Sequence, residues 1–104
     1  MSSYTSFLKS RLVKGFKEVI ILKIISEGDV WGYNIVSKIK ERYGVKISPS
    51  IIYPILSELE SKGLIKSRTE FVGRRRRKVY SITEEGLRLV EAYRNVLKAE
   101  IGGS

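Results

Sequence analysis

Two residue types that carry much of protein chemistry are missing from this sequence. Its 104 residues contain no cysteine and no histidine. Their absence excludes a disulfide framework, the usual zinc sites and the Ser-His and Cys-His pairs of nucleophilic catalysis. The carboxylates form no cluster that would suggest a metal or general-acid site. The sequence therefore predicts a protein that is not an enzyme and that uses no cofactor and no metal.

Long apolar runs are also lacking. The longest, Val19–Ile25, is interrupted by Lys23 and is far shorter than the roughly 20 residues of a membrane-spanning helix. The N-terminus lacks the basic, apolar and cleavage regions of a signal peptide. We therefore expect a cytoplasmic protein that is a single domain by its length and makes no contact with a membrane.

Acidic residues are few compared with basic ones, and the excess is localised. The net charge is +9, and the segment 62–78 alone holds eight basic residues against one acid, Glu70. The first 14 residues add Lys9, Arg11 and Lys14 with no acid. A charge placed in this way is typical of a surface that binds a polyanion. The alternative is an ordinary solvated surface with a spare basic loop.

Apolar spacing predicts three helices in the first half of the chain. A short amphipathic leading helix lies within residues 1–14. Residues 16–26 are apolar on nearly every face, so this helix should be buried against more than one neighbour. A helix from Tyr33 to Tyr43 follows and ends at Gly44.

The next helix contains an internal proline. Ser48 is its expected N-cap, Pro49 occupies the first position, where a missing N–H is no loss, and Gly63 ends it. Pro54 removes the bond to the carbonyl of Ser50, which deep in a helix costs ~3 kcal/mol or more but less in the first turns. We expect a loosened or bent first turn. Two helices joined by a short Gly-containing turn predict a helix-turn-helix.

Alternating residues after this helix predict a hairpin. Residues 64–72 form the first strand, 72–77 the tip with Gly73 in the turn, and 78–82 the returning strand. The predicted fold is mainly α with a small antiparallel β hairpin: a winged helix-turn-helix with extra N- and C-terminal helices.

A last helix is predicted from Glu84 to Glu100, capped by Thr83 and about 25 Å long. Its apolar residues form two faces, Leu87/Val90/Leu97/Ile101 and Leu89/Tyr93/Val96. One face covers the core; the other either widens the core stripe or packs on a second copy of the chain. The chain thus divides into an N-terminal extension (1–14), a DNA-binding domain (15–82) and a C-terminal dimerisation helix (83–104), with a flexible end at 102–104.

Three stretches, GYNIVSKIKERYG, SPSIIYPILSELESKGLIKS and GRRRRKVYSITEEG, resemble the PadR-like family of winged-helix transcriptional regulators. They carry the family's Gly-Tyr, its Tyr-Pro followed by Gly-Leu-Ile, and its wing closing on Tyr-x-Ile-Thr-x-x-Gly, in order within residues 15–86. The resemblance implies a homodimeric repressor that binds a pseudo-palindromic operator in double-stranded DNA. The short C-terminal helix is similar to the compact group of the family. Four consecutive arginines and the N-terminal segment depart from its pattern.

On this interpretation the start of the recognition helix enters the major groove and the basic wing follows the backbone or minor groove. The expected DNA-binding residues are Lys14, Lys17, Tyr33, Ser48, Ser50, Ile51, Tyr53, Arg74, Arg75, Arg76, Arg77 and Lys78. The expected dimerisation residues are Phe7, Leu8, Leu12, Leu89, Tyr93, Val96, Leu97 and Ile101. We expect the ring of Tyr33 in the core with its hydroxyl near a phosphate, and Trp31 in core or hinge packing.

Two other functions stay open. A low-specificity architectural protein of the nucleoid could use the same fold, because the recognition helix offers few polar side chains to read bases. The winged helix could also bind RNA or a protein. A small-molecule effector is not indicated, since the short C-terminal region leaves little room for a sensing domain. As a DNA-binding protein the chain would be cytoplasmic and associated with the nucleoid.

Overall fold

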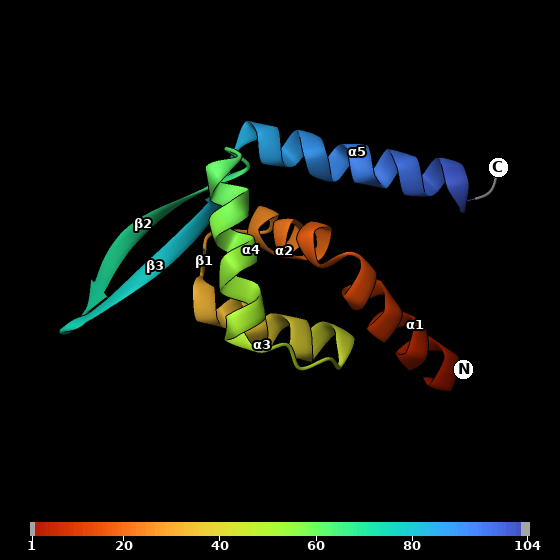
Figure 1. Cartoon of the computed structure of the whole chain (residues 1–104), viewed down its shortest axis with the longest axis horizontal. Coiled ribbons are helices and arrows are strands. Elements are labelled where there is room, and N and C mark those ends of the chain that lie inside the picture. The colour runs from red at the N-terminus through yellow and green to blue at the C-terminus, as the bar shows by residue number, and fades with distance from the viewer. Residues whose placement is uncertain (1, 103–104) are drawn as a thin grey trace.

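The computed structural model describes residues 2–102, so that of the flexible end predicted at 102–104, Gly103 and Ser104 lie outside the described residues. The elements, in chain order, are α1 (Ser2–Gly15), α2 (Lys17–Ser26), β1 (Val30–Trp31), α3 (Gly32–Tyr43), α4 (Pro49–Ser61), β2 (Ile65–Val72), β3 (Arg75–Ile82) and α5 (Glu84–Glu100) (Figure 1). The strands form one antiparallel sheet of order β1-β3-β2. This arrangement confirms the predicted winged helix-turn-helix. Within residues 2–102 no helix is both long and apolar enough to cross a membrane.

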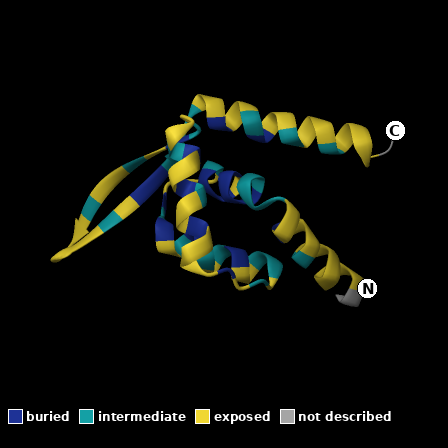
Figure 2. Cartoon of the chain, in the orientation of Figure 1, coloured by how far each residue is buried: buried dark blue, intermediate teal, exposed yellow. Residues whose placement is uncertain are grey.

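The core is aliphatic and centred on α2. Ile20, Ile21, Leu22, Ile24 and Ile25 are all buried, and α2 packs against α1, α3, α5 and β3. This confirms the expectation that the helix is covered by several neighbours. The buried side chains cluster where the helices meet the base of the wing, while the outer wing and much of α5 are exposed (Figure 2).

The leading helix packs against α2 and α3, and between Tyr4 and Gly15 only Val13 is buried. Val13 of α1 is fully buried, whereas the apolar side chains used to predict the helix are 39–73% exposed: Tyr4, Phe7, Leu8 and Leu12. The leading helix therefore presents most of its apolar surface outward.

Local signals in the sequence place both ends of α4. Ser48 precedes the helix, but its hydroxyl contacts the hydroxyl of Ser50 at 2.7 Å and makes no capping bond. The helix continues without interruption through Pro54. At its end Gly63 adopts a φ of +75°, and the N–H of Leu64 donates to the carbonyl of Leu59 at 3.0 Å. This is the Schellman motif that glycine favours after a helix.

The wing differs from its predicted form. Strand β3 begins at Arg75, not at Lys78, because Val72 pairs with Arg75 across a two-residue turn at Gly73 and Arg74. Gly73 has a φ of +64°, which a tight hairpin turn requires. Three of the four arginines predicted in the tip therefore lie in a strand, where their side chains alternate between two faces. Strand β1, which pairs Val30 with Tyr80, was not predicted at all.

Candidate nucleic-acid interface

The first half of α4 presents its outer side to solvent. Ile52 and Leu56 are fully buried and fix the inner side of the helix. Ser50 is exposed, and the side chains of Ile51 and Tyr53 are 46% and 40% exposed. Since the beginning of the recognition helix enters the major groove in helix-turn-helix proteins, these are the residues that would meet base edges and phosphates.

The basic side chains of the wing are of two kinds: some have no partner in the described part of the chain and are called free, and others are engaged in contacts. The exposed side chains of Arg74, Arg75, Arg76 and Lys78 make no ion pair or hydrogen bond with residues 2–102. Arg68 is engaged, because it contacts Asp29 at 2.7 Å and Glu70 at 3.0 Å. The free cations are the ones available to neutralise phosphates.

The pKa values agree with this division. The Arg68 guanidinium, and secondarily the Ser81 hydroxyl, lower the pKa of Asp29, which stays ionised and satisfies Arg68. Asp29 and Glu70 in turn raise the pKa of Arg68. The charge of Arg68 is thus largely balanced by two carboxylates of the protein itself.

A hollow of about 810 Å³ lies between α4 and the wing. It is lined by Trp31, Gly32, Tyr33, Tyr53, Ser57, Arg75, Arg76, Arg77, Lys78 and Tyr80. These residues are aromatic, basic or small, and none is acidic. Such a lining suits a chain of phosphates and sugars, since it offers cations to phosphate and rings to the sugar faces.

Gly32 lets the aromatic rings of this hollow close over the start of α3. A Cβ at this position would lie 3.0 Å from the Tyr53 ring and 3.2 Å from the Tyr80 ring. Tyr80 is buried, which raises the pKa of its hydroxyl. The exposed ring of Tyr53 and the buried ring of Tyr80 therefore both lie close to Gly32.

Two aromatic residues, Trp31 before α3 and Tyr33 inside it, form a small cluster, and Tyr33 differs from expectation. Tyr33 was predicted to be a core residue, but its side chain is 48% exposed. It faces Trp31 at a ring distance of 6.2 Å, and the guanidinium of Arg77 lies 4.8 Å from the centre of each ring. Trp31 is half-buried in this small cluster, outside the main core. The side chain of Arg77 thus contacts two rings of the protein, whereas those of Arg76 and Lys78 have no partner among the residues described.

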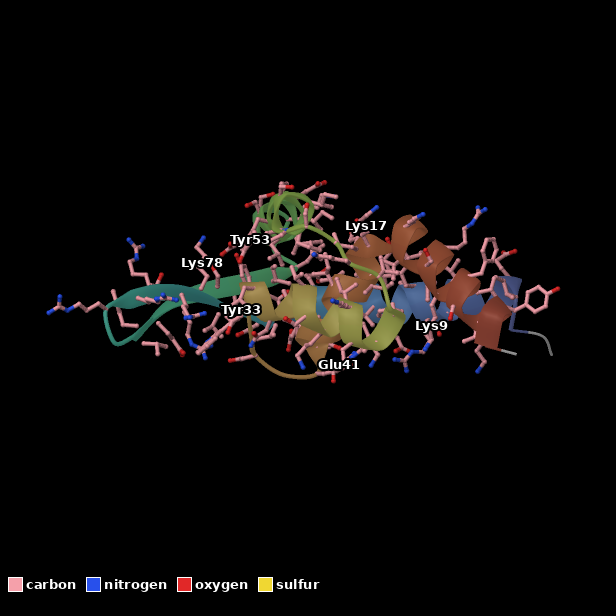
Figure 3. The ribbon with its side chains drawn as sticks, turned by 90° about the horizontal axis from the view of Figure 1, so that it is seen from below. Lys9, Lys17, Tyr33, Glu41, Tyr53 and Lys78 are labelled. Carbon is pink, nitrogen blue, oxygen red and sulfur yellow. The ribbon has the colours of Figure 1, made fainter. Side chains whose placement is uncertain are left out.

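A second basic site lies where α1 meets α2. Lys17 donates to the carbonyl of Lys14 at 3.1 Å, while Lys14 lines a smaller hollow of about 550 Å³ with Phe7, Ser10, Arg11 and Gly15. Lys17, Tyr53 and Lys78 lie along one side of the molecule and Glu41 along the opposite side (Figure 3). The face that carries the recognition helix thus extends from the wing to the start of α2.

The residues predicted for dimerisation lie on α1 and α5, which both extend away from the wing (Figure 1). Val96 and Ile101 are 59% and 80% exposed, and Leu87, which was not on the predicted list, is 48% exposed. Tyr93 and Leu97 are half-buried, and Leu89 packs against the core. The outward apolar surface here therefore consists mainly of Leu87 and Val96 of α5 and of Ile101, which follows the helix.

Four residues of the hollow, Trp31, Gly32, Ser57 and Tyr80, escaped the sequence analysis as site residues. Gly32 and Tyr80 belong to the stretches that resemble the PadR-like family, but the approach of Tyr53 and Tyr80 to Gly32 joins segments that are distant in sequence. Trp31 was noticed as the only tryptophan, although its two-residue strand gives no periodic signal.

Comparisons with known proteins all find transcriptional regulators. The model of the "Transcriptional regulator PadR-like family" matches residues 21–92. A PadR-like transcriptional regulator of Bacillus cereus is 30% identical, with a TM-score of 0.75 over 86% of this chain and 87% of that one. PadR of Bacillus subtilis, solved in complex with operator DNA, is 31% identical, with a TM-score of 0.71 over 75% of this chain and 46% of that one.

A curated relative adds the same information over a shorter stretch. The transcriptional regulator Rv3488 of Mycobacterium tuberculosis is 42% identical over 45 residues, which are 43% of this chain and 42% of that protein. The chain thus aligns with less than half of the length of that relative.

Proposed function

Because the chain belongs to the PadR-like family of transcriptional regulators, we propose that it is a homodimeric repressor that binds a specific sequence in double-stranded DNA. Members of this family are regulators and not enzymes, in agreement with the prediction from composition. The observation that carries the proposal is the hollow between α4 and the wing, with Tyr53 on one side, free cations on the other and no acidic lining residue.

In this proposal the start of α4 enters the major groove. The helix is about 20 Å long, and its exposed first turns fit a groove about 12 Å wide. Ile51 contacts thymine methyl groups, and Ser50 reaches base edges or phosphates. The hydroxyl of Tyr53 donates a hydrogen bond to a phosphate oxygen. Arg74, Arg75, Arg76 and Lys78 follow the backbone and the adjacent minor groove.

The segments on either side of the winged helix, 1–14 and 83–104, assemble the dimer. The support is the apolar surface of α1 and α5 that the isolated chain leaves exposed, including Phe7, Leu8 and Val96. A single chain rarely leaves so many large apolar side chains in solvent unless a partner covers them. Two copies related by a two-fold axis would then present two recognition helices to a pseudo-palindrome.

The composition of α4 favours a second candidate, a low-specificity architectural DNA-binding protein. The helix PSIIYPILSELES has no arginine, asparagine or glutamine, the side chains that make most bidentate contacts with bases. The two functions predict different sequence discrimination by the same surface.

Fluorescence anisotropy across a salt series tests both. One duplex comes from the upstream region of the protein's own gene and the other is its shuffled version. The proposed function predicts a preference of ~10³-fold or more for the upstream duplex. Equal, steeply salt-dependent binding of both would favour the architectural function, while no binding of either would refute both.

Repression itself needs a separate measurement. Transcription from the gene's own promoter in a purified system should fall as the protein is added and should recover when excess specific duplex competes for it. Unchanged or increased transcription at saturating protein would contradict the role of repressor.

A further inference from the structure

The four arginines of the wing are not equivalent in the structure. Arg75 and Arg76 are exposed and free of ion pairs, whereas Arg77 is half-buried. The Nε atom of Arg77 is buried and has no hydrogen-bond partner within the described chain. An unpaired buried donor is costly, so other interactions must hold this side chain in place.

Those interactions are with two aromatic rings. The guanidinium carbon of Arg77 lies 4.8 Å from the centre of the Trp31 ring and 4.8 Å from that of Tyr33. Both distances are within the range of cation–π attraction, and a half-buried guanidinium gains more from it than an exposed one.

The strand register explains why Arg77 reaches the rings and Arg76 does not. Trp31 of β1 pairs with Val79 of β3, and Arg77 lies two residues earlier on β3, on the same face. Arg76 and Lys78 point to the opposite face, across from Phe71 and Thr69. The cluster is therefore formed by β1, β3 and the start of α3, where the wing leaves the body.

We propose that Arg77 is a positioning residue, which fixes the base of the wing against Trp31 and Tyr33 and thereby sets where the free arginines lie, and that it does not bind a phosphate itself. The proposal rests on the proposed DNA-binding function for its effect on affinity, but the contact exists in the free protein. Arg68 of β2 also stabilises the base of the wing, because it forms an ion pair with Asp29, which precedes β1.

Trp31 is the only tryptophan, so it reports on this contact without a label. Arg77→Ala should uncover the indole, shift its emission to longer wavelength and increase its quenching by acrylamide. Arg77→Lys keeps a cation but not the flat guanidinium, so it should give an intermediate spectrum. Arg76→Ala, the matched control on the opposite face, should leave the spectrum of the free protein unchanged.

DNA binding gives the second measurement, with the same variants on both duplexes. Arg76→Ala should lower the slope of log K against log salt by about 0.9, the value for one lost phosphate contact. Arg77→Ala should weaken binding about tenfold on both duplexes with an unchanged slope, since two rings lose their cation but no counterion is involved. Arg77→Lys should recover part of this loss.

Two results would overturn the proposal. An unchanged Trp31 spectrum in Arg77→Ala would mean that Arg77 does not hold the base of the wing. A salt slope lowered by the same amount as in Arg76→Ala would make Arg77 a phosphate contact. Should Arg77→Ala not fold by circular dichroism, Arg77→Met, which keeps the apolar stem, replaces it in both measurements. If the wild type binds neither duplex, the proposed function fails, and the Trp31 spectrum alone decides on the contact.

Discussion

Among the glycines of residues 2–102, Gly86 leaves the least room for a Cβ atom, and this leads to a quantitative prediction for Gly86→Ala. Gly86 is buried in the first turn of α5, where a Cβ would lie 2.1 Å from the carbonyl oxygen of Leu64 and 2.7 Å from the side chain of Ile82. The first of these atoms belongs to the backbone and cannot rotate away. The added methyl group must therefore push α5 away from the start of β2.

The same movement would break the cap of α5. The hydroxyl of Thr83 accepts from the N–H of Gly86 at 3.1 Å and donates to the Leu64 carbonyl at 2.9 Å. Overpacking costs about 1–3 kcal/mol, loss of the cap about 1 kcal/mol, and alanine returns at most about 1 kcal/mol of helix propensity. We expect Gly86→Ala to lower the free energy of unfolding by about 2 kcal/mol.

Urea unfolding followed by circular dichroism measures this difference. One fixed protein concentration is used throughout, because the stability of the proposed dimer would depend on concentration. Gly15→Ala is the matched control, since a Cβ at Gly15 meets nothing within 4 Å. It should be neutral or stabilising by up to about 1 kcal/mol. A Gly86→Ala protein as stable as the wild type would refute the packing argument.

Three further predictions concern other parts of the molecule. Gly32→Ala should lower stability measurably in urea unfolding, because the new Cβ would lie 3.2 Å from the buried ring of Tyr80. It should also weaken DNA binding in anisotropy, because the same Cβ would lie 3.0 Å from the exposed ring of Tyr53 and displace it. Val96→Glu, at an exposed position, should yield monomers in light scattering; a variant that stays dimeric would contradict the assembly through α5. The Arg42 guanidinium lowers the pKa of Glu27 below its ordinary 4.5, so this pair stabilises the folded state above that value and ceases to do so as the pH falls through the lowered pKa. Glu27→Gln should therefore cost about 0.5 kcal/mol at pH 7. In acid titration the variant should lose less stability than the wild type as the pH falls below the ordinary pKa of the carboxyl, 4.5.

The sequence predicts best the elements whose ends carry local signals. The limits Glu84–Glu100 were predicted correctly, because Thr83 caps the helix and two glutamates follow it. The end of α4 at Gly63 was correct for a similar reason. Propensity was misleading at the wing, where cross-strand pairing with β2 extends β3 through three arginines that are poor indicators of a strand.

The location of the candidate site could be predicted from the charge of the sequence, but the contacts between its side chains could not. The basic segment and the recognition helix were located from sequence, and the family was confirmed over residues 21–92. Helical spacing placed Tyr33 in the core, but the structure leaves it exposed beside Trp31. The difference between Arg76 and Arg77 depends on β1, whose partner is distant in the sequence, so no local pattern could reveal it.

That distant pairing has a consequence for the order of folding. The hairpin of β2 and β3 closes over two residues and can form in about 1–10 μs. Strand β1 reaches β3 only by closing a segment of about 50 residues, between Val30 and Tyr80, which costs more chain entropy for two residue pairs. We expect the β1 ladder to form last and to open first in hydrogen exchange, and each opening would release the wing while the core of α2 stays folded.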